Sequence, residues 1–323
     1  MRPPPHVPRR AVLAGAAAAL AAPHVRAQTL AKLRVGVIPV VDIAPLQAAI
    51  RQGYFAAEGL EIDTSPAPGG AALLPALAAG TFQVGFSNIV SILLGIQEGI
   101  DFRFLAGSVR SGDRPPDINA LVVRKGSGLA TGKDFEGKRL ASNTRANIIW
   151  LRGVSWVAKT GGDWRRVNMV EVPFPQMADA LVNNQIDGAM INEPFLSNAL
   201  ATMGDRIERI AWTFNETVPG SSIAQYAAMA DWLAKNGELA EKFARALYRG
   251  VDWVEANRGP AVDALISSYT RIPVERLSTI GMPVFEKAIP PASIEEVHRT
   301  MGQFGIGGRL PPVRELLFRT AVG

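Results

Sequence analysis

The chain has 323 residues, no cysteine and a formal net charge of +5, and 48% of its residues are hydrophobic while 20% are charged. This composition predicts a globular protein rather than a disordered chain, and the length suggests two lobes. The absence of cysteine excludes disulfides, thiolate metal sites, cysteine nucleophiles and the cysteine-linked lipid anchor of a bacterial lipoprotein.

The first 27 residues carry most of the excess positive charge. They hold four arginines and no acid, and Arg9-Arg10 precede the apolar stretch Ala11–Ala22. This pattern predicts a cleavable export signal over 1–27. The paired arginines resemble a twin-arginine (Tat) signal, but Pro8 and Ala14 depart from that consensus, so ordinary Sec export stays open.

The rest of the chain is almost neutral. With residues 1–27 removed, 30 basic and 29 acidic residues remain, so the high isoelectric point no longer argues for a nucleic-acid partner. One histidine is left, His298, in an amphipathic helical stretch. Without cysteine and with a single histidine, the sequence predicts no metal centre, no cofactor and no Ser-His-Asp triad unless His298 serves one. Because no other catalytic constellation stands out in the sequence, we expect a protein that is not an enzyme.

Strands and helices alternate along most of the chain. The run LRVGVIPV at 33–40 is typical of a strand buried on both faces, and a helix follows from Asp42 to Gly53. Strands are then predicted at 61–66, 82–86, 102–106, 139–141, 168–172, 186–191 and 207–213, and helices at 71–79, 89–98, 146–160, 177–183 and 194–203. This alternation favours parallel sheets built from βαβ units.

The pattern changes after residue 230. Helices are predicted at 231–257, 260–269, 274–281, 294–304 and 313–321, with few strands between them. A helical cap on a two-lobed α/β body follows.

One internal similarity supports two related lobes. ALAAGTFQVGFSN at 76–88 and ALVNNQIDGAMIN at 180–192 share a helix, a helix-ending residue, a strand and a final asparagine. Gly80 and Asn184 stand where a left-handed residue is expected. Asn88 and Asn192 then occupy equivalent strand ends, where open α/β sheets bind ligands, and we expect them to face each other across a cleft.

The segments around these repeats resemble a known family. DIAPLQAAIRQGYFAAEGLEID and PGGAALLPALAAGTFQVGFSN, followed by KDFEGKRLASNT and VEVPFPQMADALVNNQIDGAMINEPF, are similar to the SsuA/NMT1/THI5-like substrate-binding proteins of ABC importers. The resemblance covers nearly all of the chain after the signal. It implies a periplasmic-binding-protein fold of the second class, in which two α/β lobes joined by two crossovers trap a ligand by hinge closure.

This fold implies a division of the chain. Lobe 1 would comprise 31–117 and 230–323, lobe 2 would comprise 123–222, and the hinges would lie near 118–124 and 223–229. The segments Ile118–Arg124 and Ile223–Ala230 are apolar and strand-like, as crossovers require.

The candidate binding residues lie mostly at predicted helix starts, where free backbone N–H groups favour an anion or a polar acceptor. As alternatives to binding, the same residues serve as turns, helix caps or surface groups. The candidates are Asp42, Gly69, Gly70, Ser87, Asn88, Ser142, Asn143, Thr144, Arg145, Gln176, Asn192, Glu193 and Tyr226. Aromatic walls are expected from Phe86, Trp150, Phe174 or Tyr226.

The charges of these candidates bear on the ligand. Asp42 and Glu193 would repel a doubly charged anion unless the arginines, Arg145 and Arg110, compensate. A monoanion with an amine or amide, or a polar aromatic ring, fits better.

The sequence therefore predicts a periplasmic solute-binding protein, monomeric and not a lipoprotein. It would capture a sulfonate, a carboxylate or an N-heterocycle and deliver this small ligand to the permease and ATPase of an ABC importer, with no nucleic acid involved. A sensing role toward a membrane receptor stays open. A THI5-like pyrimidine synthase is the least supported alternative, because such enzymes rely on a cysteine-rich motif that this chain lacks.

Overall fold

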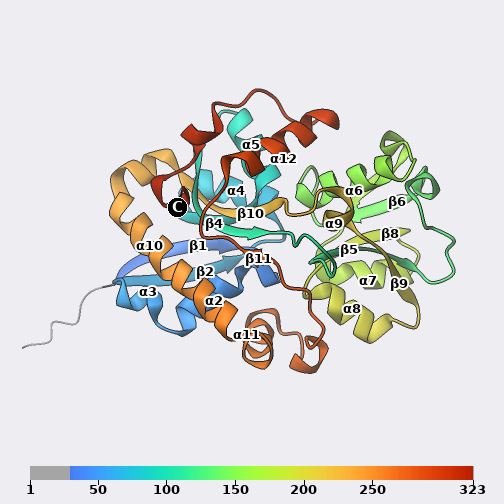
Figure 1. The fold of residues 1–323 in the computed structure, drawn as a ribbon, viewed down its shortest axis with the longest axis horizontal. Helices are drawn as coiled ribbons and strands as arrows, with labels where there is room; N and C mark the ends of the chain where they lie inside the picture. The colour runs from blue at the N-terminus through green and yellow to red at the C-terminus, as the bar shows by residue number, and fades with distance from the viewer. Residues whose placement is uncertain (1–29, 323) are drawn as a thin grey trace, which may run out of the picture. The chain divides into compact units, whose positions relative to one another are not determined.

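Two separate sheets organise the part of the chain that this computed structural model describes, residues 30–322 (Figure 1). The predicted export signal over 1–27 lies outside the described residues. We call the first sheet with its helices lobe 1 and the second sheet with its helices lobe 2. Neighbours of known structure share this two-lobed arrangement, so the predicted fold class is confirmed.

Lobe 1 is built on a mixed sheet with the strand order β11-β4-β10-β3-β1-β2. β1 is parallel to β2 and β3, whereas β10 is antiparallel to β3 and β4. Its strands are β1 (Ala31–Val37), β2 (Leu60–Pro66), β3 (Val84–Asn88), β4 (Phe102–Arg110), β10 (Ser222–Met229) and β11 (Val284–Phe285). β3 is buried along its whole length because helices cover both faces of this sheet.

The helices of lobe 1 come from both ends of the described chain. They are α2 (Ala44–Arg51), α3 (Tyr54–Ala57), α4 (Gly70–Ala78), α5 (Ile89–Gln97), α10 (Ala230–Ala256), α11 (Pro260–Thr270) and α12 (Pro291–Gln303). α10, orange in Figure 1, packs against α2 and α3, and α12 packs against α5. The C-terminal segment thus completes the lobe that the N-terminal strands begin. No helix within residues 30–322 has the length and apolar character needed to span a membrane.

Lobe 2 repeats the α/β design with the strand order β7-β6-β8-β5-β9. β6 is parallel to β7 and β8, and β5 runs antiparallel to β8 and β9. Its elements are β5 (Asn119–Arg124), β6 (Arg139–Ser142), α6 (Ile148–Lys159), β7 (Asn168–Glu171), α7 (Phe174–Val182), β8 (Gly188–Asn192), α8 (Phe195–Met203), β9 (Ile207–Trp212) and α9 (Thr213–Thr217).

The internal similarity in the sequence corresponds to equivalent structural units. β3 and β8 are both five residues long, fully buried and end in asparagine. The residues before them, Gly80 and Asn184, both have positive φ, at 74° and 58°. A residue in the left-handed conformation commonly follows the end of a helix. The two helix–strand–asparagine units therefore end their helices in the same manner.

The chain crosses between the sheets twice, over 111–118 and 213–221. Asp117 joins these connections: its carboxylate accepts hydrogen bonds from the backbone N–H of Ile118 at 2.7 Å and of Asn215 at 2.8 Å. Burial raises the pKa of Asp117 to about 6. The segments predicted as hinges, 118–124 and 223–229, lie largely in β5 and β10 rather than in the connections between the sheets. The location of the hinge stays a prediction.

Two of the predicted C-terminal helices are wrong. Segment 274–281 forms only a 3-10 turn at Val274–Arg276, because Pro273 and Pro283 bracket it, and β11 follows. Segment 313–321 forms two 3-10 turns, Val313–Leu316 and Arg319–Ala321. Between them Phe318 N–H donates to the carbonyl of Phe104 at 2.9 Å, so backbone bonds to β4 replace those of a helix.

The close packing of α10 on α2 requires a glycine. A Cβ at Gly250 would lie 2.1 Å from the carbonyl oxygen of Pro45 and 3.0 Å from Ala49 Cβ. We expect Gly250→Ala to lower the free energy of unfolding by about 1–3 kcal/mol, measured by urea denaturation. Gly302→Ala in α12 is the control, because a Cβ there meets nothing within 4 Å; it should be neutral or stabilising. Equal stability of the two variants would contradict the packing argument.

Candidate ligand-binding site

A small cavity lies where strand ends and helix starts of the two lobes meet. It is lined by Ile38, Val40, Asp42, Phe86, Asn88, Ile223 and Ala224 from lobe 1 and by Asn143, Asn147, Ile148, Ile149, Phe174 and Asn192 from lobe 2. Its volume of about 30 Å³ is room for about one water molecule. Since small-molecule sites measure about 300–1,000 Å³, this cavity by itself has no room for an organic ligand.

Asn88 connects the lobes at this cavity. Its side-chain oxygen caps α5 by accepting from Ser91 N–H at 3.0 Å. The same oxygen accepts from Ile148 N–H, at the start of α6 in lobe 2, at 3.1 Å. Asn88 therefore both ends β3 and contacts a helix of the opposite lobe, as its position at a strand end predicted.

The loop before α6 supplies the polar wall of lobe 2. Asn147 caps α6 by accepting from Trp150 N–H at 2.8 Å, and its amide donates to Asn143 at 2.7 Å and to Thr144 at 2.9 Å. Ser142 donates to Asn147 at 3.1 Å. Asn143 in turn donates to the carbonyl of Pro68 in lobe 1 at 3.1 Å. These buried side chains thus form one network that reaches across the cleft.

Gly69 and Gly70 bring the start of α4 against this wall. A Cβ at Gly69 would lie 2.6 Å from Thr144 and 2.8 Å from Asn143, both in lobe 2. A Cβ at Gly70 would lie 2.1 Å from Ser87 Oγ and 2.8 Å from the Asn88 amide. The predicted glycine pair therefore permits a close approach between the lobes as well as within lobe 1.

Asp42 lies at the lobe 1 side of the cavity, in the 3-10 turn Val41–Ile43 after β1. Its side chain is buried, and Oδ1 has no hydrogen-bond partner. Burial raises the pKa of Asp42 to about 7, although a bond with its own backbone opposes this rise. The nearby hydroxyls of Tyr226 and Tyr269 have raised pKa values, first because they are buried and then because the Asp42 charge is close.

Glu193 is buried but fully bonded, in contrast to Asp42. Its carboxylate accepts from Ser197 N–H at 3.0 Å, from Ser197 Oγ at 2.9 Å and from Gly281 N–H at 3.1 Å. Its carbonyl accepts from Val41 N–H across the cleft at 3.3 Å. Burial raises the pKa of Glu193 to about 7. These bonds favour a role in joining α8 and the C-terminal segment to the cleft rather than direct ligand contact.

Other predicted residues lie away from the small cavity. Tyr226 is buried behind Phe86, with ring centroids 5.4 Å apart, and Gln176 is exposed on α7. Arg145 is 82% exposed and pairs with Glu171 at 3.4 Å. It borders a second pocket of about 350 Å³ with Ser142, Thr144 and Trp150. All but one residue of that pocket belong to lobe 2, so it lacks the two-lobe construction of the small cavity.

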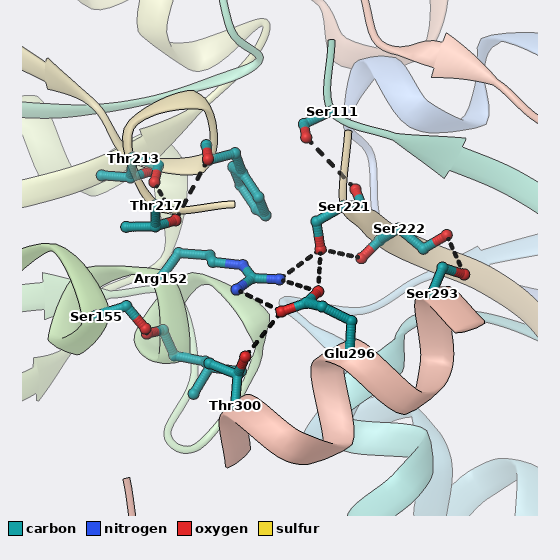
Figure 2. A network of polar contacts seen from close by, with 12 residues as sticks. Ser111, Arg152, Ser155, Thr213, Thr217, Ser221, Ser222, Ser293, Glu296 and Thr300 are labelled. Carbon is teal, nitrogen blue, oxygen red and sulfur yellow. Dashed lines mark hydrogen bonds and ion pairs between the residues drawn. The ribbon is translucent and has the colours of Figure 1, made fainter. Parts of the chain in front are cut away.

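A charged pair joins the lobes beside the crossings (Figure 2). Arg152 of α6 is fully buried, and its Nη2 lies 3.0 Å from Glu296 Oε2 of α12. Both side chains also bond Ser221, in the second crossing, and Thr300 donates to Glu296 at 2.8 Å. Burial lowers the pKa of Arg152, and the charge of Glu296 opposes this fall. Burial by itself would raise the pKa of Glu296, but Arg152 and the hydroxyls of Thr300 and Ser221 hold that pKa below its usual value.

Asn147 and the Arg152–Glu296 pair are absent from the sequence prediction. Asn147 carried a usable signal, since asparagine favours the N-cap, but the predicted helix began at Ala146, two residues before the observed start at Ile148. Arg152 gave none, because an arginine inside an amphipathic helix normally faces water.

Comparison with known proteins agrees with this geometry. The alkanesulfonate-binding protein SsuA of Xanthomonas axonopodis pv. citri, solved bound to MOPS, superimposes with a TM-score of 0.74 at 17% identity over 89% of this chain and 98% of the other. A putative ABC transporter periplasmic binding protein of Brachyspira hyodysenteriae is 25% identical over 252 residues, 74% of this chain and 70% of the relative. The riboflavin-binding protein RibY of Chloroflexus aurantiacus is 27% identical over 287 residues, 85% and 77% respectively.

Two α/β lobes with polar side chains between their strand ends define the substrate-binding proteins of ABC-type import systems. The NMT1/THI5-like family model matches residues 40–260, and the chain belongs to this family. The resemblance seen in the sequence is thereby confirmed. The named relatives are binding proteins, and the ligands in their names differ.

Proposed function

We propose that this protein captures a small organic ligand between its lobes, outside the cytoplasm, and delivers it to the permease and ATPase of an ABC importer. The observation that carries the proposal is the cavity whose polar lining comes from both lobes, through Asp42 and Asn88 on one side and Asn143 and Asn192 on the other. A ligand that contacts both sides stabilises the closed form, which is how binding changes the conformation that a permease meets.

The direct test is to measure the mass of the ligand that the protein retains through purification. Native mass spectrometry of the full-length protein purified from the cell envelope of its own organism should show a mass above that of the polypeptide. Isothermal titration with the released compound should then give a Kd below about 100 μM, or roughly −5.5 kcal/mol. The proposal would be contradicted if the purified protein carried no ligand and if titration with sulfonates, carboxylates, N-heterocycles and flavins released or absorbed no heat.

Closure makes a prediction about Gly69. Its φ of 176° is extended backbone that any residue adopts, so Gly69→Ala should leave lobe 1 folded. The added Cβ would meet Thr144 and Asn143 only when the lobes close. We therefore expect at least a tenfold weaker affinity for the carried ligand by titration calorimetry.

Small-angle scattering with saturating ligand supplies the second measurement for this variant. Gly69→Ala should keep a larger radius of gyration than the wild type, whereas Gly302→Ala should close normally because its Cβ has free space. Unchanged affinity and closure of Gly69→Ala would show that the lobes meet differently in solution.

A further inference from the structure

The charge of the small cavity restricts its ligand. Among the residues that line it, Asp42 is the charged one, and the polar remainder are the asparagines at 88, 143, 147 and 192. The candidate arginines already have acidic partners of their own: Arg145 is exposed and paired with Glu171, and Arg110 is paired with Asp113 and Glu286. The buried Arg152 is bound to Glu296. An anionic ligand would therefore enter an apolar, negatively charged space without a cation to receive it.

Asp42 also carries unused hydrogen-bonding capacity. Its Oδ1 is buried and has no hydrogen-bond partner within residues 30–322. Buried polar atoms are nearly always bonded, and a buried acceptor without a donor is destabilising, more so when it is charged. Because Asp42 lines the cavity, a donor from outside the chain is the partner that its carboxylate lacks.

A structural role for Asp42 does not account for this arrangement. Glu193 shows what a structural carboxylate looks like in this protein, since it accepts three hydrogen bonds from Ser197 and Gly281. Asp117 likewise accepts two backbone N–H groups. Asp42 instead lines the cavity, and its Oδ1 has no donor among residues 30–322.

We infer that Asp42 accepts an N–H group of the ligand, so that the site selects an amine, an amidine or an amino-substituted N-heterocycle over sulfonates and carboxylates. A ligand N–H restores the hydrogen bond that Oδ1 lacks, and a cationic nitrogen also offsets the cost of burying the carboxylate. The asparagines supply both donors and acceptors for the rest of a polar ring. This inference rests on the proposed function and narrows its three ligand classes to one.

The test compares ligands that differ in one group. Benzamidine is matched with benzoate, and 4-aminopyrimidine with pyrimidine, with 1-propanesulfonate as a further anion. Isothermal titration into full-length protein at pH 8, where the Asp42 carboxylate is ionised, should give at least tenfold tighter binding for the N–H member of a pair. The same titration is run on Asp42→Asn, on Tyr226→Phe and on the exposed control Asp205→Asn.

Asp42→Asn should weaken binding of the N–H ligand at least tenfold without weakening that of its matched partner, and Asp205→Asn should match the wild type. Tyr226→Phe, which deletes a hydroxyl behind Phe86 and outside the cavity, should bind like the wild type. The comparison of matched ligands on the wild type keeps the test usable should the asparagine variant misfold. Equal binding of benzoate or propanesulfonate, unaffected by Asp42→Asn, would overturn the inference. So would a carried ligand, weighed by native mass spectrometry, that has no N–H group.

The outcomes separate this inference from the function on which it rests. A carried sulfonate or carboxylate would overturn the role of Asp42 and leave the protein a binding protein. If the purified protein carried no ligand and no compound of the panel gave heat on titration, the proposed function would be contradicted, and the inference with it.

Discussion

Replacing Arg152 by methionine is expected to lower the free energy of unfolding by about 3–5 kcal/mol. Arg152 is fully buried and paired with Glu296, whose side chain is 22% exposed. Removing the guanidinium leaves the Glu296 carboxylate with hydroxyl donors only, from Ser221 and Thr300, in a largely desolvated place. The cost is therefore that of an uncompensated charge, which exceeds the value of the pair itself.

A double-mutant cycle tests this reason for the loss. Arg152→Met with Glu296→Met removes both charges, so the double variant should recover most of the stability that the single variant loses. Arg165→Met is the control, because Arg165 is 74% exposed and its pair with Asp163 should contribute less than about 1 kcal/mol. Urea denaturation measures five proteins: the wild type, Arg152→Met, Glu296→Met, the double variant and Arg165→Met. A loss for Arg152→Met no larger than for Arg165→Met would refute the role of the buried pair.

The same pair should also affect closure, because it joins α6 of lobe 2 to α12 of lobe 1 beside the second crossing.

The contribution of the Arg152–Glu296 pair to stability should depend on pH with a definite sign. The folded pKa of Glu296 lies below its usual value, so its contribution is present above the unfolded pKa and is lost as the pH falls through the folded pKa. The stability difference between wild type and Arg152→Met should therefore shrink in acid.

Local rules predicted the strands and helices that carry the site. Buried β-branched runs marked the central strands, and the left-handed Gly80 and Asn184 marked two equivalent units that end in Asn88 and Asn192. Both asparagines line the same cavity, as their positions at strand ends led us to expect. These features follow from backbone rules that act within a few residues, and such rules are legible in a sequence.

Features that depend on distant partners were not predictable. Segment 313–321 has a helical pattern, but its backbone bonds to β4 from more than 200 residues away. Arg152 has the composition of a surface residue, and its burial depends on α12 arriving from the other lobe. Arg145, the predicted anion partner, is exposed and paired with Glu171. Nothing in the local sequence distinguishes this exposed arginine from the buried Arg152.

Asp42→Asn is expected to change how stability depends on pH. The pKa of Asp42 rises from 3.8 to about 7 on burial, so the folded protein retains a proton that the unfolded chain releases. A raised folded pKa means that the contribution is fully present below pH 3.8 and is lost as the pH rises through about 7. That shift corresponds to about 4 kcal/mol. The groups facing Asp42, Tyr226 and Tyr269, have raised pKa values and stay neutral in this window.

The measurement is urea denaturation at pH 5, 6, 7 and 8. Between pH 5 and 8, which covers only part of the range from 3.8 to about 7 and above, the wild type should lose about 2–3 kcal/mol more than Asp42→Asn, whereas Asp205→Asn should follow the wild type. Parallel curves for wild type and Asp42→Asn would mean that the carboxyl is solvated in solution. A ligand that donates an N–H to Asp42 stabilises the ionised carboxylate and lowers its pKa, so saturating ligand should flatten the wild-type curve.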